Sequence, residues 1–129
     1  HTTFNRSLPM RPKITRFEDL DVWKESMQLA VAIYSALRLS RDFGLREQMQ
    51  RAAVSIPSNV AEGYERESNK EFVQFLGYAR GSSGELRTQL YLAAKLGEID
   101  ATGCKEMIKK SRKVSAMLGK LIQVRKRDF

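Results

Sequence analysis

The chain has 129 residues, of which 42% are hydrophobic, so it is long enough to form one domain with an apolar core of its own. Its single cysteine, Cys104, excludes an internal disulfide, and we expect a reducing, cytoplasmic location. No apolar run approaches the ~20 residues that cross a membrane, and the first residues lack the apolar core of a signal peptide.

The formal net charge of +8 is unevenly distributed. Residues 1–16 carry four basic groups and no acidic one, residues 17–104 carry ten basic and thirteen acidic groups, and residues 105–129 carry nine basic and two acidic groups. The body of the chain is therefore mildly acidic and both ends are basic. This asymmetry favours a polyanionic partner, with nucleic acid as the first choice.

Three parts follow from these patterns. Residues 1–16 are interpreted as a flexible basic arm, because Pro9 and Pro12 prevent a helix there. Residues 17–125 carry helical patterns throughout, and residues 126–129 form a short basic tail. We therefore expect one folded domain between two basic extensions.

The predicted first helix begins at Phe17 or Leu20, with Asp19 or Asp21 as its cap, and ends at Ser40. Its apolar positions recur every three or four residues, at Trp23, Met27, Ala30, Tyr34 and Leu37. Further apolar residues flank this stripe, at Leu29, Val31 and Ile33. A helix that is apolar on several sides must bury more than one of them, so we expect the chain to associate with copies of itself.

The predicted second helix begins near Leu45, after a stop at Gly44, and ends at Gly63. Its apolar stripe keeps its phase across Pro57, at Leu45, Met49, Ala52, Ile56 and Val60. We therefore expect a kinked but continuous helix, in which Ser55 or Ser58 bonds to the carbonyl that the proline leaves unpaired. The alternative is a new helical segment capped by Ser55.

The predicted third helix runs from Lys70 to Leu96, after a cap at Ser68 or Asn69 and before a terminating glycine. Its apolar spacing continues through "GSSG" at residues 81–84, so we interpret that run as helix. Three glycines share one helical face, at Gly77, Gly81 and Gly84. Each costs about 1 kcal/mol relative to alanine, which favours close packing against another helix or, alternatively, a ligand against the bare backbone.

The predicted fourth helix runs from Asp100 to Arg125. Its apolar stripe consists of Met107, Val114, Leu118, Leu121 and Ile122. At 100° per residue, a contiguous basic arc lies beside that stripe, at Lys105, Lys109, Arg112, Lys113 and Lys120. Four helices with short loops imply antiparallel neighbours, and no segment alternates with the period of a strand. We therefore predict an all-α fold, an up-down-up-down four-helix bundle.

Catalytic chemistry has little support in the residue inventory. The only histidine is His1, in the arm, so Cys104 has no partner within the folded part that would form its thiolate. No set of residues has the spacing of a zinc or di-iron site, and Glu62 with Glu85 is the one carboxylate pair that we consider. We expect no enzymatic activity, no metal and no cofactor.

Asn59 and Glu62 follow the proline and lie on neighbouring faces of the second helix. If they are buried, they need partners, because an unpaired buried polar group costs about 1–3 kcal/mol. The candidate partners are Arg51, Arg66, Ser82 and Glu85. We interpret the set as a structural hydrogen-bond network, with a ligand or nucleic-acid contact as the alternative.

The basic residues of the fourth helix and tail are the candidate nucleic-acid-binding residues, namely Lys105, Lys109, Lys110, Arg112, Lys113, Lys120, Arg125, Lys126 and Arg127. The alternative is a solvated helix face that binds nothing. Aromatic residues are scarce in this part of the sequence apart from Phe129, which favours contact with phosphates over base stacking.

Three segments together resemble a known family. "FEDLDVWKESMQLA", "RAAVSIPSNVAEGYER" and "FVQFLGYARGSSGELRTQL" are similar to the 23S rRNA intervening-sequence proteins, over about residues 17–124. The family's signature positions, which we take as structural, fall on Arg51, Ala52, Ser55, Ile56, Pro57, Asn59, Ala61, Glu62, Gly63, Gly81, Ser82 and Glu85.

This resemblance implies a bacterial, cytoplasmic protein with a left-handed antiparallel bundle. It also implies a homopentameric ring with a basic surface, as in the related accessory proteins of diversity-generating retroelements. Nucleic-acid binding is the expected role, and a protein-interaction or scaffold module that docks a reverse transcriptase is the alternative. The number five rests on the resemblance alone, and the family supplies no catalytic residues.

Overall fold

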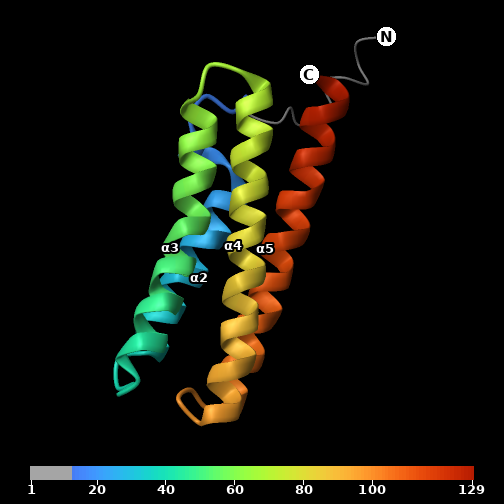
Figure 1. Cartoon of the computed structure of the whole chain (residues 1–129). Coiled ribbons are helices and arrows are strands. Elements are labelled where there is room, and N and C mark those ends of the chain that lie inside the picture. The colour runs from blue at the N-terminus through green and yellow to red at the C-terminus, as the bar shows by residue number, and fades with distance from the viewer. Residues whose placement is uncertain (1–12) are drawn as a thin grey trace.

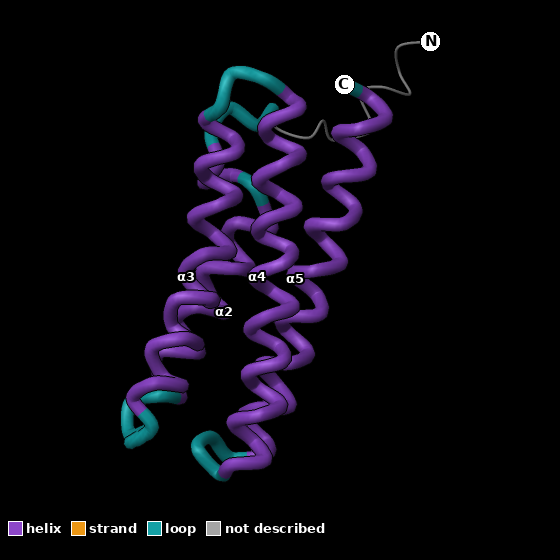
Figure 2. The backbone as a smooth tube through the Cα atoms, in the orientation of Figure 1, coloured by secondary structure: helices purple, strands orange, loops and turns teal. Residues whose placement is uncertain are grey.

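The computed structural model describes residues 13–129, and the predicted arm at residues 1–12 lies outside them. A short 3-10 helix, η1 (Phe17–Asp19), precedes four α-helices. These are α2 (Asp21–Ala36), α3 (Phe43–Glu65), α4 (Asn69–Leu96) and α5 (Ala101–Asp128). The part of the chain from residue 13 onward contains no strand (Figure 2), so the all-α prediction is confirmed.

The four helices alternate in direction and enclose one core (Figure 1). α2 packs against α3 and α5, and α4 packs against the same two helices, while the backbones of the diagonal pairs stay further apart within the described residues. This arrangement confirms the predicted up-down-up-down four-helix bundle. Every helix contributes fully buried side chains, among them Leu29, Ile33, Met49, Ile56, Leu76, Leu86, Leu90, Val114 and Leu118.

The second predicted helix is continuous, as expected. α3 passes through Pro57, whose side chain is buried, without interruption. Ser55 does not cap a new segment, because it lies in mid-helix: its carbonyl accepts a hydrogen bond from Asn59 Nδ2 at 2.8 Å. The alternative of two helical segments is therefore wrong.

The predicted stop at Gly44 is also wrong, because this glycine lies in the first turn of α3. The side chain of Asp42 accepts a hydrogen bond from the Leu45 N–H at 3.0 Å and so begins the helix earlier. α2 lacks a side-chain cap at Leu20: Asp21 is its first residue, and Asp19 pairs with an arginine before it. α2 ends at Ala36, short of the predicted end at residue 40.

The last two helices begin and end close to the predicted residues. Ser68 caps α4 by accepting from the Glu71 N–H, and Gly97 ends it in the left-handed region at φ 73°. Asp100 caps α5 by accepting from the Gly103 N–H. α5 continues past Arg125 to Asp128, so most of the predicted basic tail is helical.

Close helix packing occurs at a different glycine from those predicted. A Cβ atom placed on Gly77, Gly81 or Gly84 would have no neighbour within 4 Å, because these positions point away from the core. At Gly63, in contrast, a Cβ would lie 2.6 Å from the Cβ of Phe75. Gly63 is therefore the residue that lets α3 approach α4.

Candidate functional site

A chain of hydrogen bonds joins α3 to α4 in the middle of the bundle. Asn59 Nδ2 donates to the Ser55 hydroxyl at 2.9 Å, and that hydroxyl is 2.8 Å from the Ser82 hydroxyl. These three residues are part-buried and bond to one another. These hydrogen bonds therefore help to hold α3 against α4.

Glu62 does not take part in this chain. Its carboxylate is exposed and pairs with Arg66 at 2.8 Å, and Arg66 also pairs with Glu71 at 3.4 Å. The hydrogen bond that Arg66 donates to Glu62 raises the pKa of Arg66 above its ordinary value. Arg66, one of the predicted partners, thus does bind Glu62, but on the surface and not in the predicted buried network, because the helix phase that turns Asn59 toward α4 turns Glu62 toward solvent.

The proposed carboxylate pair is not formed either. Ser55 and Ser82 mark the same level of the antiparallel helices α3 and α4. Glu62 and Glu85 lie on opposite sides of that level, about 15 Å apart along the bundle at 1.5 Å per residue. Glu85 is exposed, and Arg51 is occupied by a surface pair with Glu47 at 2.9 Å.

Two of the candidate basic residues of α5 face α2. Lys113 Nζ lies 2.7 Å from Glu25 Oε1, and Lys110 Nζ donates to Gln28 Oε1 at 3.0 Å. The hydrogen bond from Lys113 lowers the pKa of Glu25, against the opposing effect of burial. These two lysines hold α5 to α2 and are less available to a ligand.

The basic residues at the end of α5 form a second group. Arg125 Nε donates to Asn69 Oδ1 at 2.8 Å, and Arg127 pairs with the neighbouring Asp128 at 3.0 Å. Lys120 and Lys126 are exposed. The predicted basic residues therefore do not form one continuous surface, because some face α2, some contact the start of α4 and some are exposed to solvent.

The remaining three candidates lie along the contact between α5 and α4. Lys105, Lys109 and Arg112 line a groove of about 510 Å³ that also includes Tyr91 of α4 and the carboxylate of Glu106. Arg112 Nη2 donates to the Tyr91 hydroxyl at 2.7 Å, which orients the guanidinium without neutralising it.

Two arginines of α4 extend this group, and the sequence interpretation missed both. Arg87 Nη1 lies 3.4 Å from the hydroxyls of Ser111 and Ser115 in α5. The guanidinium of Arg80 lies over Gly119, where a Cβ would be 3.3 Å from Cζ. Both arginines reach α5 because of the register between the two helices, which a pattern within one helix does not reveal.

We call these five residues the basic seam: Arg80, Arg87, Lys105, Lys109 and Arg112. Within residues 13–129, none of the five forms an ion pair. Along α5 the seam extends from Lys105 to the level of Gly119, about 21 Å. Duplex nucleic acid carries one phosphate per ~3.4 Å of axis on each strand, so this length spans several phosphates. The seam can therefore neutralise a polyanion.

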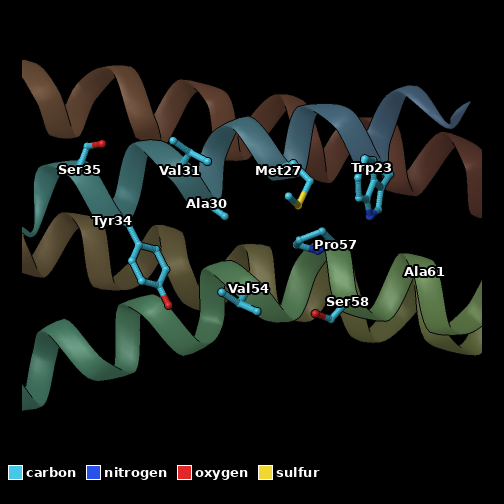
Figure 3. A pocket seen from close by; sticks show the side chains of 10 residues that line it. All are labelled: Trp23, Met27, Ala30, Val31, Tyr34, Ser35, Val54, Pro57, Ser58 and Ala61. Atoms are coloured by element: carbon cyan, nitrogen blue, oxygen red, sulfur yellow. The ribbon is translucent and has the colours of Figure 1, made fainter. Parts of the chain in front are cut away.

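An apolar groove lies on the opposite side of the bundle, between α2 and α3 (Figure 3). It measures about 480 Å³, and Met27 lies opposite Pro57 while the ring of Tyr34 points toward α3. Val31, beside it, is 63% exposed although Ile33 is fully buried. Two sides of α2 are thus apolar, as predicted, and one of them is not covered by the chain itself. We call this surface the apolar groove.

Other chemical groups offer little support for a reaction. Within residues 13–129, no three histidine, cysteine or acidic side chains are arranged to hold a metal ion. Cys104 is buried, and burial raises the pKa of its thiol, which disfavours the reactive thiolate. None of the described helices has the length and apolar character needed to cross a membrane.

Comparisons with known proteins agree with this architecture. The chain is similar to a crystal structure of a protein with unknown function from the S23 ribosomal protein family of Bacteroides thetaiotaomicron, with a TM-score of 0.74 and 22% identity. The match covers 78% of this chain and 97% of that one, and at this identity it supports the fold alone. A search of curated proteins gives no significant match. The 23S rRNA-intervening sequence protein family matches residues 18–120, and the chain belongs to this family.

Proposed function

We propose that this protein is a non-enzymatic, homo-oligomeric bundle that binds the phosphate backbone of RNA or DNA through the basic seam. The observation that carries the proposal is the alignment of five cationic side chains, without ion pairs among the described residues, along the contact between α4 and α5. Such a row binds by releasing counterions from the nucleic acid. Neither the family nor the structural neighbour indicates a catalytic activity.

Self-association is supported by the apolar groove between α2 and α3. Burying Val31, Met27 and Tyr34 against another copy would remove apolar surface from water, at roughly 25 cal/mol per Å². A pentamer, which the family resemblance implies, would carry five charges of +8, about +40 in total, and would attract polyanions strongly. The buried single cysteine is consistent with a cytoplasmic location.

Salt dependence of binding tests the nucleic-acid proposal. Because the family is named after 23S rRNA, a structured RNA duplex is the first probe. For five phosphate contacts the association constant falls about 500-fold between ~50 and ~200 mM salt, by analogy with B-DNA. Absence of binding at ~50 mM salt, or affinity that is insensitive to salt, would contradict the proposal.

The apolar groove also supports a second candidate, a module that docks another protein such as a reverse transcriptase. Light scattering separates the two uses of the groove, because a monomer at micromolar concentration would exclude self-association. Capture of a reverse transcriptase by that monomer after nuclease treatment would then favour docking.

A further inference from the structure

The α3–α4 connection and the end of α5 lie at the same end of the bundle (Figure 1). A pocket opens there, lined by residues from both. Its volume is about 460 Å³, within the range that holds small organic ligands. Its wall combines aromatic and aliphatic residues, among them Tyr64, Phe72, Leu121, Val124 and Phe129, with the charged and polar residues Arg66, Glu67, Ser68, Asn69 and Arg125. We call it the aromatic end pocket.

Arg125 is held rigidly in the wall of this pocket. Its Nε donates to Asn69 Oδ1 at 2.8 Å, and Asn69 Nδ2 donates back to the Arg125 carbonyl at 3.0 Å. The guanidinium carbon lies 4.9 Å from the ring centre of Phe72 and 3.8 Å from that of Phe129. The cation therefore lies over both rings, and the hydrogen bonds with Asn69 orient it.

The two rings differ in how much of their surface remains free. Phe72 is 4% exposed and belongs to the core, whereas Phe129 is 68% exposed. Arg125 covers one face of the Phe129 ring, so the exposed surface lies largely on the other face and the edge. A planar ligand can stack there without displacing the arginine.

Charges of both signs surround the pocket, because Arg66 and Glu67 line it and two further lysines lie beside it. Lys126 follows Arg125, and Lys13 precedes the pocket-lining Ile14; both are exposed and neither forms an ion pair within the described residues. Cations beside an exposed aromatic ring are the combination that holds single-stranded nucleic acid, with phosphates on the cations and a base on the ring. Arg125 also lies six residues beyond Gly119, about 9 Å along α5 from the end of the basic seam and about 120° around the helix from it.

We infer that the exposed face of Phe129, at the rim of the aromatic end pocket, stacks on an unpaired nucleobase of a nucleic acid whose backbone lies along the basic seam. This inference rests on the proposed function and specifies its ligand as a duplex with an unpaired end or bulge. The sequence interpretation, which disfavoured stacking, did not account for the fold placing Tyr64 and Phe72 beside Phe129.

The experiment compares a blunt RNA duplex with the same duplex carrying a two-nucleotide overhang that contains 2-aminopurine. We expect the overhang to bind about 5- to 150-fold more tightly, the range for one base stacked on an aromatic side chain. We also expect its fluorescence to be quenched on binding. Phe129→Ala should abolish both effects and leave blunt-duplex affinity unchanged, and Phe129→Tyr should retain them.

Phe43→Ala is the matched control, because Phe43 is 69% exposed and lies at the start of α3, away from the pocket. Blunt-duplex binding with no advantage for the overhang, or quenching that persists in Phe129→Ala, would overturn the pocket and leave the seam intact. Failure of both duplexes to bind would overturn the pocket and the proposed function together.

Discussion

The two long sides of this bundle share one core and differ in chemistry. The side formed by α2 and α3 carries the apolar groove, and the side formed by α4 and α5 carries the basic seam. In each helix the core uses one stripe of residues, so the flanking positions are free to differ. The comparison shows that one bundle core leaves its two outer sides free to differ, one being apolar and the other basic.

Removing charge from the basic seam is expected to have the largest effect, a loss of affinity for nucleic acid. Replacing Lys105, Lys109 and Arg112 together with Gln removes three phosphate contacts, worth about 500-fold in affinity at ~100 mM salt. The slope of the logarithm of the association constant against the logarithm of the salt concentration should become shallower by the amount expected for about three phosphate contacts. A titration of duplex RNA at several salt concentrations measures this slope.

The matched control removes the same charge away from the seam, with Arg38→Gln and Arg41→Gln in the turn between α2 and α3 and Arg51→Gln on α3, all at exposed positions. We expect a much smaller loss from this triple variant. Equal losses from both triple variants would show that net charge, rather than the seam, determines binding.

A charge in the apolar groove should break self-association. Val31→Glu places a carboxylate on a residue that is 63% exposed in the single chain and buried in the proposed contact. We expect the variant to remain helical and to sediment as a monomer at micromolar concentration, because an unpaired buried charge costs several kcal/mol. Leu39→Glu, at a residue 89% exposed in the turn after α2, is the control and should leave the oligomer unchanged.

The close packing of α3 against α4, which joins the two sides, can be tested by substituting a glycine. Gly63→Ala forces α3 away from α4, since the added Cβ would lie 2.6 Å from that of Phe75, and we expect it to destabilise the fold by about 1–3 kcal/mol. Gly81→Ala meets no atom within 4 Å and should instead stabilise α4 by about 0.5–1 kcal/mol. Chemical denaturation measures the change in the free energy of unfolding for each variant. The two changes should have opposite signs.

The smallest expected effect is on stability, from the ion pair between Glu25 of α2 and Lys113 of α5. Because Lys113 lowers the pKa of Glu25 in the folded state, the pair stabilises the protein above the ordinary pKa of a glutamate, near 4.5. This contribution, below about 1 kcal/mol because Lys113 is largely exposed, is lost as the pH falls through the lowered pKa.

Denaturation of Glu25→Gln against pH provides the check. We expect the variant to lose stability at pH 7 and to differ less from the natural sequence at acid pH. A difference that stays constant from pH 7 down to about 3 would contradict this account.

The local patterns of the sequence predicted the helices well, because periodicity and capping act within a few residues. The continuity of α3 through Pro57 and the end of α4 at Gly97 were both predictable in this way. The contribution of Arg80 and Arg87 was not, since it depends on the register between α4 and α5. The environment of Phe129 was hidden for the same reason, because its neighbour Phe72 lies on another helix.

The unequal lengths of α2 and α5 have a mechanical consequence. α2 has 16 residues, about 24 Å, and α5 has 28, about 42 Å. The pairs Glu25–Lys113 and Gln28–Lys110 set these antiparallel helices in a register that places Asp21 level with Met117. Beyond Met117, α5 extends past the start of α2 and leans mainly on α4. On the α2 side this end is therefore lined by the segment before the helix, through Ile14 and Leu20, and lengthening α2 by two turns would turn that segment into helix and change how both residues line the pocket.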